Sequence, residues 1–540
     1  MGGSGMGGSG MGGSGMGGSG NASSSSSGMV DPCMAGCAAN TWDVDGNPLT
    51  GTCGCEYKCT QVSADADPID ENYTDENCDG SDGIAEQCIY VSSGQGSDAN
   101  AGTRQDPMQT IAAAISKAQM VGVPSVCLSG EIYNEAVKVV SGISIYGGFD
   151  VNDADFRFRR TAAVTTTVNA AGTVFDAPQI DQDTHIEGIT IQATTPAGAA
   201  QSTYGVHLGG GVGTLYVRFD TMMIAAGTNG DKGADGTPPA QSSAPNGGNG
   251  TKGGQKDNNS GIGAAAPVCD APGGKGGDGG ADAAAGQNGA AGNGGTPGGN
   301  GAGANSCTPA IGSPGPSGGA GQSGTDSTQG NPGQGGNTLG TVNASFYNPS
   351  SGSDGTNAPN GKAGGGGGGG GGGKGDGLCF GDWDKGGGGG AGGCGGKGGL
   401  GGKGGQGGGG SFGVFAAAGK IIVSKNDITT STGGAGGIGG NGASGQLGGV
   451  GGTGGGNNDD SGPGGPGGKG GKGAAGGPGG GGGGGPSACL ARSGAVTFTF
   501  AMNSCSTGTP GFGANGGTNP EGGIGGKGLN GTAGPNVQLN

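Results

Sequence analysis

The sequence predicts a mostly β protein in which a parallel β-solenoid with one early helix carries a bundle of glycine-rich, polyproline-II-like helices. The first observation is the glycine content, 154 of 540 residues, with glycine on every third position over long stretches. The second is a series of short β-type apolar runs, separated by turns, in about 86–225. The third is that apolar islands near 412–430 and 488–506 stand between glycine tracts. With 30% hydrophobic residues overall, a packed core of ordinary size is expected only in these regions.

The chain begins with a glycine- and serine-rich stretch, 1–30, which indicates a flexible tether. Its four Met-Gly-Gly-Ser-Gly copies lack the basic start and the apolar stretch of a signal peptide. They also lack a myristoylation signal, since Met6 stands where Ser or Thr is needed. We therefore expect either that an export signal was removed before Met1 or that this end is not native.

A cysteine-rich and acidic module follows over 31–87. Its cysteine spacing, C-x3-C…C-x-C-x3-C, matches no common zinc pattern and no histidine lies nearby, so disulfides are favoured over a zinc site. The total of 14 cysteines is even, which predicts disulfides and an oxidising compartment. Cross-links would also stabilise glycine tracts that have few side chains to bury. The cysteines concerned are Cys33, Cys37, Cys53, Cys55 and Cys59 in the module, and Cys269, Cys307, Cys379, Cys394, Cys489 and Cys505 in or beside the glycine tracts.

Residues 88–226 are predicted to form the β-helix. Short, irregularly spaced strands are typical of a solenoid in which each turn supplies stacked strands. One helix interrupts them: Asp106 is the expected cap, and Ile111, Ile115 and Ala118 share an apolar face before Gly122. We expect this helix to cover the open end of the solenoid. The predicted strands are 88–91, 126–128, 137–140, 143–146, 164–168, 185–191, 204–208 and 215–219.

A larger repeat organises the second half of the chain. Apolar runs that begin at Gly213, Gly419 and Gly494 each lead into a glycine-rich tract. Three successive solenoid turns are therefore expected to emit a glycine-rich insertion from the same corner. The predicted insertions are 227–410, 433–487 and a C-terminal segment 508–540, and the predicted single turns between them are 411–432 and 488–507.

The triplet phase of glycine is what favours ordered helices over a linker. Between Gly433 and Gly454 glycine falls on every third residue without a slip, and the phase returns in 386–410 and 464–485. A helix with three residues per turn explains this phase, because one of its edges is then free of side chains and backbones can approach closely. Disorder, which is common in tracts this rich in glycine, stays open as the alternative. Lysines in the third triplet position are expected to face water: Lys397, Lys403, Lys469, Lys472 and Lys527.

Charge and hydropathy exclude some partners. The net charge of −17 argues against nucleic acid and anionic membrane surfaces. No apolar run approaches the roughly 18–20 residues that span a bilayer. The sequence therefore predicts no nucleic acid partner and no membrane span.

Three motifs resemble a known group of proteins. They are DGNPLTGTCGCEYKCT from Asp45, DENCDGSDG from Asp75, and YVSSGQGSDANAGT from Tyr90, followed by IYGGF from Ile145. Together they resemble secreted bacterial surface proteins in which a Cys-rich segment and an Asp-rich, metal-binding-like motif precede a right-handed parallel β-helix of the pectate-lyase-like type. The resemblance covers about 40–225 and implies this fold and an extracellular location; most members have no known activity. Separately, the glycine triplets resemble the polyglycine-II bundles of certain glycine-rich antifreeze proteins.

A calcium loop is the leading candidate site. Asp75, Asn77 and Asp79 supply oxygen ligands at positions 1, 3 and 5, Ser81 offers its carbonyl, and Glu86 stands at position 12. Gly80 occupies the position of the sharp turn. The departures from the pattern are Asp82, where an apolar residue usually packs, and the absence of evident flanking helices. A solvated acidic linker, held by Cys78 and Cys88, is the alternative.

Other polar groups are weaker candidates. Asp181, Asp183, His185 and Glu187 alternate along one strand and could hold a metal or act as an acid–base pair, although an outward strand face is the favoured interpretation. His207 is predicted to be structural. The remaining candidates, expected in a solvated loop but also suited to an acidic sugar, are Arg157, Arg159 and Arg160.

These observations favour a structural or interaction protein over an enzyme. We expect an extracellular structural protein of a cell-surface layer, fibre or adhesin, which could self-assemble into filaments because solenoid ends and bundle edges expose backbone groups. A β-helix that binds or cleaves polysaccharide is the first alternative. Ice binding by a flat face of the bundle is the second.

Overall fold

The computed structural model describes residues 36–44, 48–49, 51–64, 67–154, 156–255, 260–304, 314–337, 339–373 and 384–539. The predicted tether, 1–30, and the cysteines Cys33, Cys307 and Cys379 lie outside these residues. The chain divides into two compact units. Unit 1 comprises Met1–Asp67 and Asp75–Gly80, and unit 2 comprises Pro68–Thr74 and Ser81–Asn540.

Unit 1 is held mainly by disulfides. Its two short strands, β1 (Thr41–Trp42) and β2 (Tyr57–Lys58), pair antiparallel. The disulfides Cys37–Cys55 and Cys59–Cys78 cross-link the loops around them. The prediction of disulfides rather than zinc in this module is confirmed for these four cysteines. A unit with so few buried apolar side chains depends on such cross-links.

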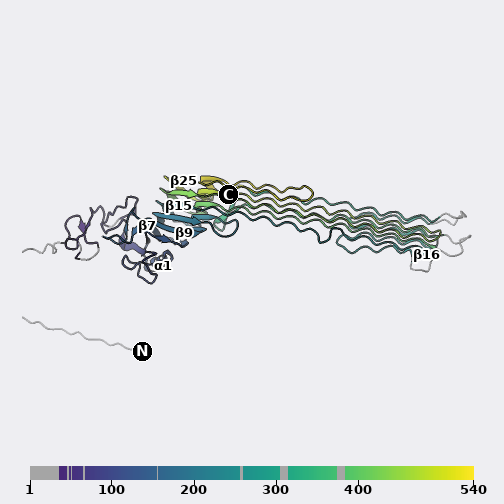
Figure 1. Ribbon diagram of the computed structural model, residues 1–540, viewed down its shortest axis with the longest axis horizontal. Helices are drawn as coiled ribbons and strands as arrows, with labels where there is room; N and C mark the ends of the chain where they lie inside the picture. The colour runs from purple at the N-terminus through teal and green to yellow at the C-terminus, as the bar shows by residue number, and fades with distance from the viewer. Residues whose placement is uncertain are drawn as a thin grey trace, which may run out of the picture. The chain divides into compact units, whose positions relative to one another are not determined.

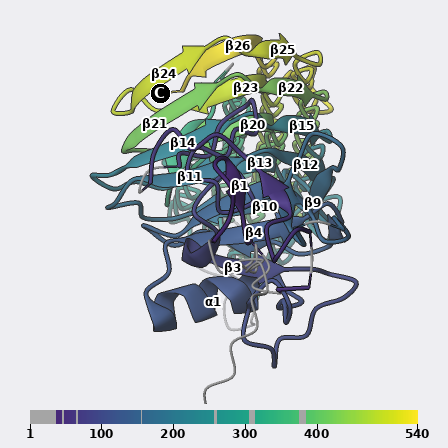
Figure 2. The same ribbon diagram turned by 90° about the vertical axis from the view of Figure 1, so that its left-hand side faces the viewer.

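Unit 2 consists mainly of three parallel sheets, which we number by the order in which the chain visits them in its later rounds. In Figure 2 their strands are stacked one above another. The first sheet contains β6 (Val137–Lys138), β10 (Thr173–Ala177), β13 (Thr203–Leu208), β20 (Ser411–Ala416), β23 (Ser487–Arg492) and β26 (Ala533–Gln538). The second contains β3 (Cys88–Val91), β4 (Ser125–Ser129), β7 (Ser144–Asp150), β11 (Thr184–Glu187), β14 (Thr214–Arg218), β21 (Lys420–Ser424) and β24 (Thr497–Ala501), and β8 (Arg159–Arg160) pairs antiparallel with β7. The third contains β5 (Ile132–Tyr133), β9 (Thr166–Ala171), β12 (Ile189–Thr194), β15 (Thr221–Ile224), β22 (Asp427–Thr430) and β25 (Ser504–Ser506). The remaining elements are the 3-10 turn η2 (Ala85–Gln87) and the antiparallel pairs β16 (Gly254–Gln255) with β19 (Asp384–Lys385) and β17 (Thr341–Asn343) with β18 (Phe346–Asn348).

The later strands recur in a fixed order, first sheet, second sheet, third sheet: β13–β14–β15, then β20–β21–β22, then β23–β24–β25. Each strand pairs with its equivalent in the next round. In the first sheet, for example, Val206 pairs with Val414, which pairs with Leu490, and all three are fully buried. Stacking equivalent apolar residues builds one continuous core from a chain that is poor in apolar residues overall.

A recurring turn joins the second sheet to the third. In the later rounds it contains a non-glycine residue in the left-handed region: Phe219, Lys425 or Met502. The next residues, Asp220, Asn426 and Asn503, hydrogen-bond one another between rounds. Asp220 N donates to Asn426 Oδ1 (2.9 Å), and Asn426 N donates to Asn503 Oδ1 (3.0 Å). Asn426 Nδ2 and Asn503 Nδ2 also donate to the carbonyls of Val217 and Val423, both at 2.9 Å.

Helix α1 (Ile111–Val121) lies at the β3 end of the stack (Figure 2). Its buried face contains Ile111, Ile115 and Ala118, as predicted, and Gly122 ends it with φ 76°. The predicted cap was wrong: the helix starts four residues later, where Thr110 Oγ1 accepts from the Ala113 amide at 3.2 Å. Asp106 lies outside the first turn because Met108 pairs with Val91 of β3 before the helix begins.

Three glycine-rich stretches leave the stack at equivalent positions. We call the chain between β15 and β20, between β22 and β23, and between β25 and β26 the first, second and third glycine segments. β15, β22 and β25 are neighbours in the third sheet, and β20, β23 and β26 are neighbours in the first. The three glycine segments therefore leave from neighbouring strands of the third sheet and return to neighbouring strands of the first. Within the predicted C-terminal segment 508–540, β26 returns to the first sheet although it contains Gly534 and Pro535.

Backbone hydrogen bonds join the glycine segments to one another, and the bonds repeat every third residue. Figure 1 shows the segments running side by side away from the strands. Three consecutive glycines, Gly388 to Gly390, donate to three different stretches of chain, and the next three residues donate to the same three stretches in the same order. The first three bonds are Gly388 N to Thr251 O (3.0 Å), Gly389 N to Gly277 O (2.8 Å) and Gly390 N to Gly465 O (3.0 Å).

Few side chains enter the interior of this array, and most of those that do are alanine methyl groups, such as those of Ala363 and Ala391. A Cβ on Gly389 would overlap the carbonyl oxygen of Gly367, and one on Gly390 would overlap that of Gly452. Residues with side chains occupy the outer positions instead, where Lys403 is exposed and bonds Asp354. The glycine in each triplet is thus required by the close approach of neighbouring backbones. The disulfide Cys269–Cys394 adds a covalent link inside the first segment.

Asparagine and aspartate side chains terminate the hydrogen-bonding pattern at several edges. Asn246 and Asn249 lie one triplet apart and accept from the amides of Val450 and Thr453, both at 2.9 Å. On another edge Asn357 Oδ1 accepts from Gly401 N at 2.8 Å. These side-chain oxygens stand where the carbonyl of a further strand would otherwise lie, so they satisfy edge amides without one.

Candidate functional site

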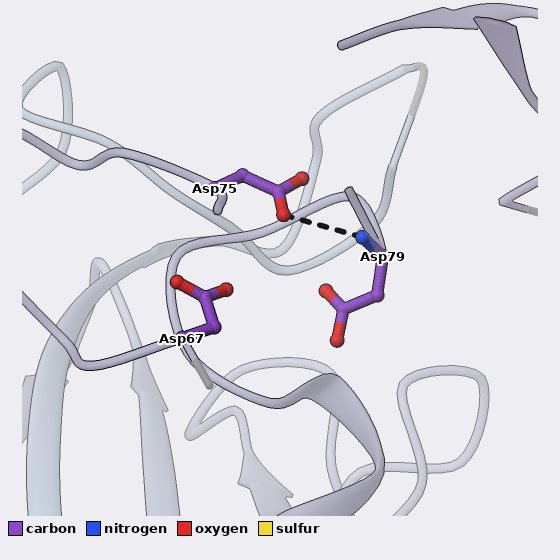
Figure 3. A group of neighbouring side chains, drawn as sticks. All are labelled: Asp67, Asp75 and Asp79. Carbon is purple, nitrogen blue, oxygen red and sulfur yellow. Dashed lines mark hydrogen bonds between the residues drawn. The ribbon is translucent and has the colours of Figure 1, made fainter. Parts of the chain in front are cut away.

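The loop Asp75–Gly80 of unit 1 is organised by side-chain oxygens that accept backbone amides. Asp75 Oδ2 accepts from Gly80 N at 2.9 Å, and Asn77 Oδ1 accepts from Asp79 N at 2.9 Å. Cys78 and Gly80 both have positive φ, 62° and 111°, which turns the chain sharply. The disulfide from Cys78 to Cys59 fixes the loop to the rest of unit 1. These contacts curl the loop so that its carboxylates point toward one centre (Figure 3).

Three carboxylates converge in this loop. Oxygens of Asp67, Asp75 and Asp79 lie within 4.8 Å of one another (Figure 3). Asp67 is only 6% exposed, and its Oδ1 accepts from Glu76 N at 3.3 Å. Bringing three anions together is unfavourable unless protons or a cation compensate their charge. Hard oxygen ligands of this kind suit Ca²⁺.

The predicted ligands divide between the two units. Asp75, Asn77 and Asp79 belong to unit 1, and Ser81 and Glu86 belong to unit 2. The Ser81 hydroxyl is buried and accepts from Arg160 N at 2.9 Å, and Glu86 is exposed on η2.

Asp67 was not among the predicted ligands. The calcium-loop pattern counts only twelve consecutive positions from Asp75, and Asp67 precedes them. Its place in the acidic stretch was the available signal.

The unusual Asp82 has a structural explanation. Its carboxylate is buried in unit 2 and forms an ion pair with the buried guanidinium of Arg160. Burial raises the pKa of Asp82 to about 7, and Arg160 opposes this rise. Arg160 therefore belongs to the interior and not to a solvated loop. The other two arginines are also engaged: Arg157 Nη1 donates to Gln105 O at 2.7 Å, and Arg159 lies 3.8 Å from Asp153.

The predicted row of acidic residues and histidine lies on and beside β11. His185 Nδ1 is 2.6 Å from Glu187 Oε1, and its ring stacks on Tyr216 of the next strand at a centroid distance of 4.4 Å. Glu187 is buried and pairs with Arg218 at 2.7 Å. These contacts link neighbouring strands of the second sheet. The other two members, Asp181 and Asp183, accept from Gln179 Nε2 (2.8 Å) and Thr214 N (2.9 Å).

His207 is fully buried in the first sheet. Its Nδ1 lies 2.7 Å from Asp176 Oδ1, its Nε2 lies 2.9 Å from Ser345 O, and its ring stacks on Phe346 at 3.9 Å. The histidine thus anchors the β17–β18 hairpin of the first glycine segment against β10 and β13, which agrees with the structural role predicted for it.

An open cavity of about 810 Å³ lies beside this hairpin. One part of its lining is aromatic, from Tyr204 and Phe346, and another is polar, from Asp176, Lys138 and Gln406. An aromatic surface next to hydrogen-bonding groups can contact both the apolar face and the hydroxyls of a sugar ring.

No protein family, curated protein or solved structure matches this chain. Among the described residues, no helix is both long and apolar enough to cross a membrane. The described disulfides place the protein outside the reducing cytoplasm.

Proposed function

We propose that this chain is an extracellular structural protein in which a β-helix carries a stiff glycine bundle, as part of a cell-surface layer, fibre or adhesin. The observation that carries the proposal is the three-residue repeat of backbone hydrogen bonds among the glycine segments. An array of long passes joined by backbone hydrogen bonds suits a mechanical or spacing role, because it extends far from the sheets that support it.

The proposal includes a finer view of the fold. The three parallel sheets are the faces of one right-handed parallel β-helix, since parallel crossover connections are nearly always right-handed. The glycine segments are polyglycine-II helices, because a threefold helix directs successive amides toward three neighbours. The β-helix agrees with the resemblance to secreted bacterial surface proteins, and that class remains part of the proposal. The polyglycine-II helices agree with the separate resemblance to glycine-rich antifreeze proteins.

Amide hydrogen exchange tests whether the glycine segments are ordered in solution. We expect slow exchange at Gly388, Gly389 and Gly390, whose amides are bonded in three directions. Exchange at the rate of an unfolded peptide would mean that the segments are a tether, and the structural role would fail.

Self-association is the second part of the proposal. The stack ends at β24, β25 and β26, and these strands are neighbours of only one strand each in their sheets. Open strand edges can pair with another chain, although Pro535 lacks an N–H on one of them. Electron microscopy over a concentration series should show filaments, layers or paired particles. A monodisperse monomer at high concentration would contradict assembly.

Calcium binding by unit 1 is the third part. Asp67, Asp75, Asp79 and the Asn77 amide oxygen are the groups that would hold the ion, which would stabilise a unit with little apolar core. Titration of the full chain with Ca²⁺ should raise its unfolding temperature, and Asp75→Asn should weaken binding at least about tenfold. The matched control is Glu71→Gln, because Glu71 is an exposed carboxyl of unit 2 that pairs with Lys425. An unchanged unfolding temperature with Ca²⁺ would refute this site.

Polysaccharide binding is a second candidate function, favoured by the cavity beside the β17–β18 hairpin. Titration with neutral and acidic oligosaccharides should detect binding, and Phe346→Leu should weaken it by removing the aromatic face. Exposed Val212→Ala, outside the cavity lining, provides the control. The candidate fails if no oligosaccharide binds or if both variants behave alike.

A further inference from the structure

The third glycine segment occupies a slot on the second one, and this slot continues beyond it. The first limb of the third segment, about 509–518, lies between the outgoing pass of the second segment (433–456) and its return pass (464–485). Amides of the outgoing pass donate to the limb, and amides of the limb donate to carbonyls of the return pass. The bonds are Gly436 N to Phe512 O, Gly439 N to Asn515 O, Gly442 N to Thr518 O, Gly511 N to Gly485 O, Ala514 N to Gly482 O and Gly517 N to Gly479 O.

The limb ends where Asn519 caps the next acceptor. Its Nδ2 donates to Gly476 O at 2.9 Å, and the chain then turns back. Beyond this point the two passes of the second segment run on together. Gly464 donates to Gly455 and Gly467 donates to Gly452, both at 2.9 Å. The two passes that form the walls of the slot thus continue past the point where the limb ends.

In this continuation four backbone amides and four backbone carbonyls have no hydrogen-bond partner among the described residues. They keep the three-residue spacing of the occupied part. We call this set of groups the open slot. The donors are the amides of Gly445, Gly448, Gly451 and Gly454, and the acceptors are the carbonyls of Gly464, Gly467, Gly470 and Gly473.

The geometry of the walls is the same in the occupied and open parts. In the occupied part a Cβ on Gly436 would overlap the carbonyl oxygen of Gly482, which accepts from the limb. In the open part a Cβ on Gly448 would overlap that of Gly470 in the same way. Donors and acceptors are therefore placed alike along the whole slot, and only the occupant is missing from the second part.

The neighbouring slot, which holds the second limb of the third segment, does not continue in this way. Its donor row along the return pass reaches Pro478, Pro466 and Pro463, which have no N–H. The amides of Ala475 and Lys472 in the same row are taken by the carboxylates of Glu521 (3.2 Å) and Asp326 (2.6 Å). In this row the Lys469 amide has no partner among the described residues, but blocked positions lie on both sides of it, so the neighbouring slot offers no continuous row of donors.

Exposed apolar side chains flank the open slot. Leu447 is 53% exposed and Val450 is 60% exposed, and both stand in the outer triplet position of the outgoing pass. A strand lying in the slot would cover part of them, which adds apolar burial to the backbone bonds.

We propose that the open slot binds an extended strand of another polypeptide with glycine or alanine at every third residue. The small residue is needed because a Cβ at Gly511 or Gly517 of the natural occupant would overlap the carbonyl of Gly434 or Gly440, and Ala514 marks the largest side chain accepted in that row. From Gly445 to Gly454 the slot accommodates a strand of about ten residues, or roughly 30 Å. The mode of binding is strand addition to a free backbone edge, with a threefold helix in place of a β-strand.

The test uses the full chain and a synthetic peptide that copies residues 509–518. We expect the peptide to slow exchange at the amides of Gly445, Gly448 and Gly451 at least about tenfold, while Gly439 and Gly442, already bonded, do not change. A control peptide with valine at the positions of Gly511, Ala514 and Gly517 should have no effect. Equal protection by both peptides, or none by either, would overturn the proposal.

Two variants of the protein sharpen this test. Gly448→Ala should displace the Gly470 carbonyl and weaken peptide binding at least about tenfold. Ser444→Ala, at an exposed position on the same pass, should leave peptide binding unchanged. Slow exchange at Gly439 in both variants verifies that the array is intact. If the open-slot amides are already protected without peptide, increasingly so at higher protein concentration, a second copy of this chain occupies the slot and a separate partner is ruled out.

Discussion

The parallel sheets and the glycine segments of unit 2 both form a buried interior, but they fill it with different groups: apolar side chains in the sheets and backbone in the glycine segments. In the sheets, equivalent side chains such as Val206, Val414 and Leu490 stack in register and exclude water. In the glycine segments the interior contains almost no side chains, and consecutive buried glycines such as Gly388, Gly389 and Gly390 bond to three different stretches of chain. The first region derives its stability from apolar area, and the second from dense hydrogen bonding and close backbone contact. The difference teaches that a core can be built without apolar side chains when glycine removes the steric barrier.

The largest expected effect comes from placing a side chain inside the array. Gly389→Val would drive a branched side chain into the Gly367 carbonyl and break bonds to several neighbours. We expect a loss of about 3 kcal/mol or more, with fast amide exchange throughout the glycine segments while the sheets stay protected. Lys403→Val, at an exposed outer position, should change stability by no more than about 0.5 kcal/mol. Similar effects of the two variants would disprove the steric account.

The equivalent change in the sheets should be smaller and should have the opposite distribution. Val414→Ala removes two methyl groups from a fully buried position in β20. The expected cost is about 2 kcal/mol, from lost apolar burial and a partly filled cavity. Thermal unfolding with amide exchange should show opening of the sheets before the glycine segments. Opening of the array first would mean that the two regions do not have separate cores.

The turn between the second and third sheets offers a pH-dependent test. Burial raises the pKa of Asp220 well above its usual range, whereas the equivalent positions of later rounds are Asn426 and Asn503. Because its pKa is higher folded than unfolded, Asp220 stabilises the fold most fully below its unfolded pKa of about 3.9, and this contribution is lost as pH rises through the folded value. Asp220→Asn should remove the dependence and add about 1–2 kcal/mol at pH 8.

Denaturation at pH 4 and at pH 8 measures this effect. The asparagine amide can donate to the Ile186 carbonyl as Asn426 does to the paired Val217, which is why the substitution fits the turn. An equal gain at both pH values would show that Asp220 is not the group responsible.

The smallest expected effect concerns the edges of the array. Asn249→Ala removes the oxygen that accepts from Thr453 N. The site is exposed, so water replaces the lost acceptor and the cost should be about 0.5 kcal/mol or less. Exchange at the Thr453 amide should nevertheless rise about fivefold, and Asn249→Asp, which keeps an acceptor, should restore it. No change in exchange would show that the side chain does not protect this edge.

The sequence revealed features that depend on periodicity or on repeated local patterns. The apolar face of α1, most strands of the second sheet and the common exit of the glycine segments all follow from such patterns. It missed β10 and β26, where Gly172, Gly534 and Pro535 are typical of turns, because pairing with neighbouring strands outweighs local preference. It also missed Thr110 as the helix cap, because the pairing of Met108 with Val91 of β3 delays the start of the helix and is a tertiary contact that local pattern does not reveal.

The candidate metal site shows the limit of motif counting. Asp75, Asn77 and Asp79 were found because they occupy consecutive odd positions of a loop pattern. Asp67 joins Asp75 and Asp79 only through the fold of unit 1, and no linear pattern contains it. Likewise, the open slot depends on which amides remain unbonded after the passes have packed, and spacing alone does not reveal this.

The three-residue repeat of hydrogen bonds also constrains how this chain can change in length. Adding or removing one or two residues within a pass such as 386–409 would rotate every later residue to a different neighbour, and side chains would then face the carbonyls that now meet glycine. A change of three residues preserves the orientation of every residue, so glycine still meets the neighbouring carbonyls. The glycine segments can therefore lengthen or shorten only in whole triplets of roughly 9 Å, so that evolution adjusts their reach in fixed steps while the strands at their base keep their register.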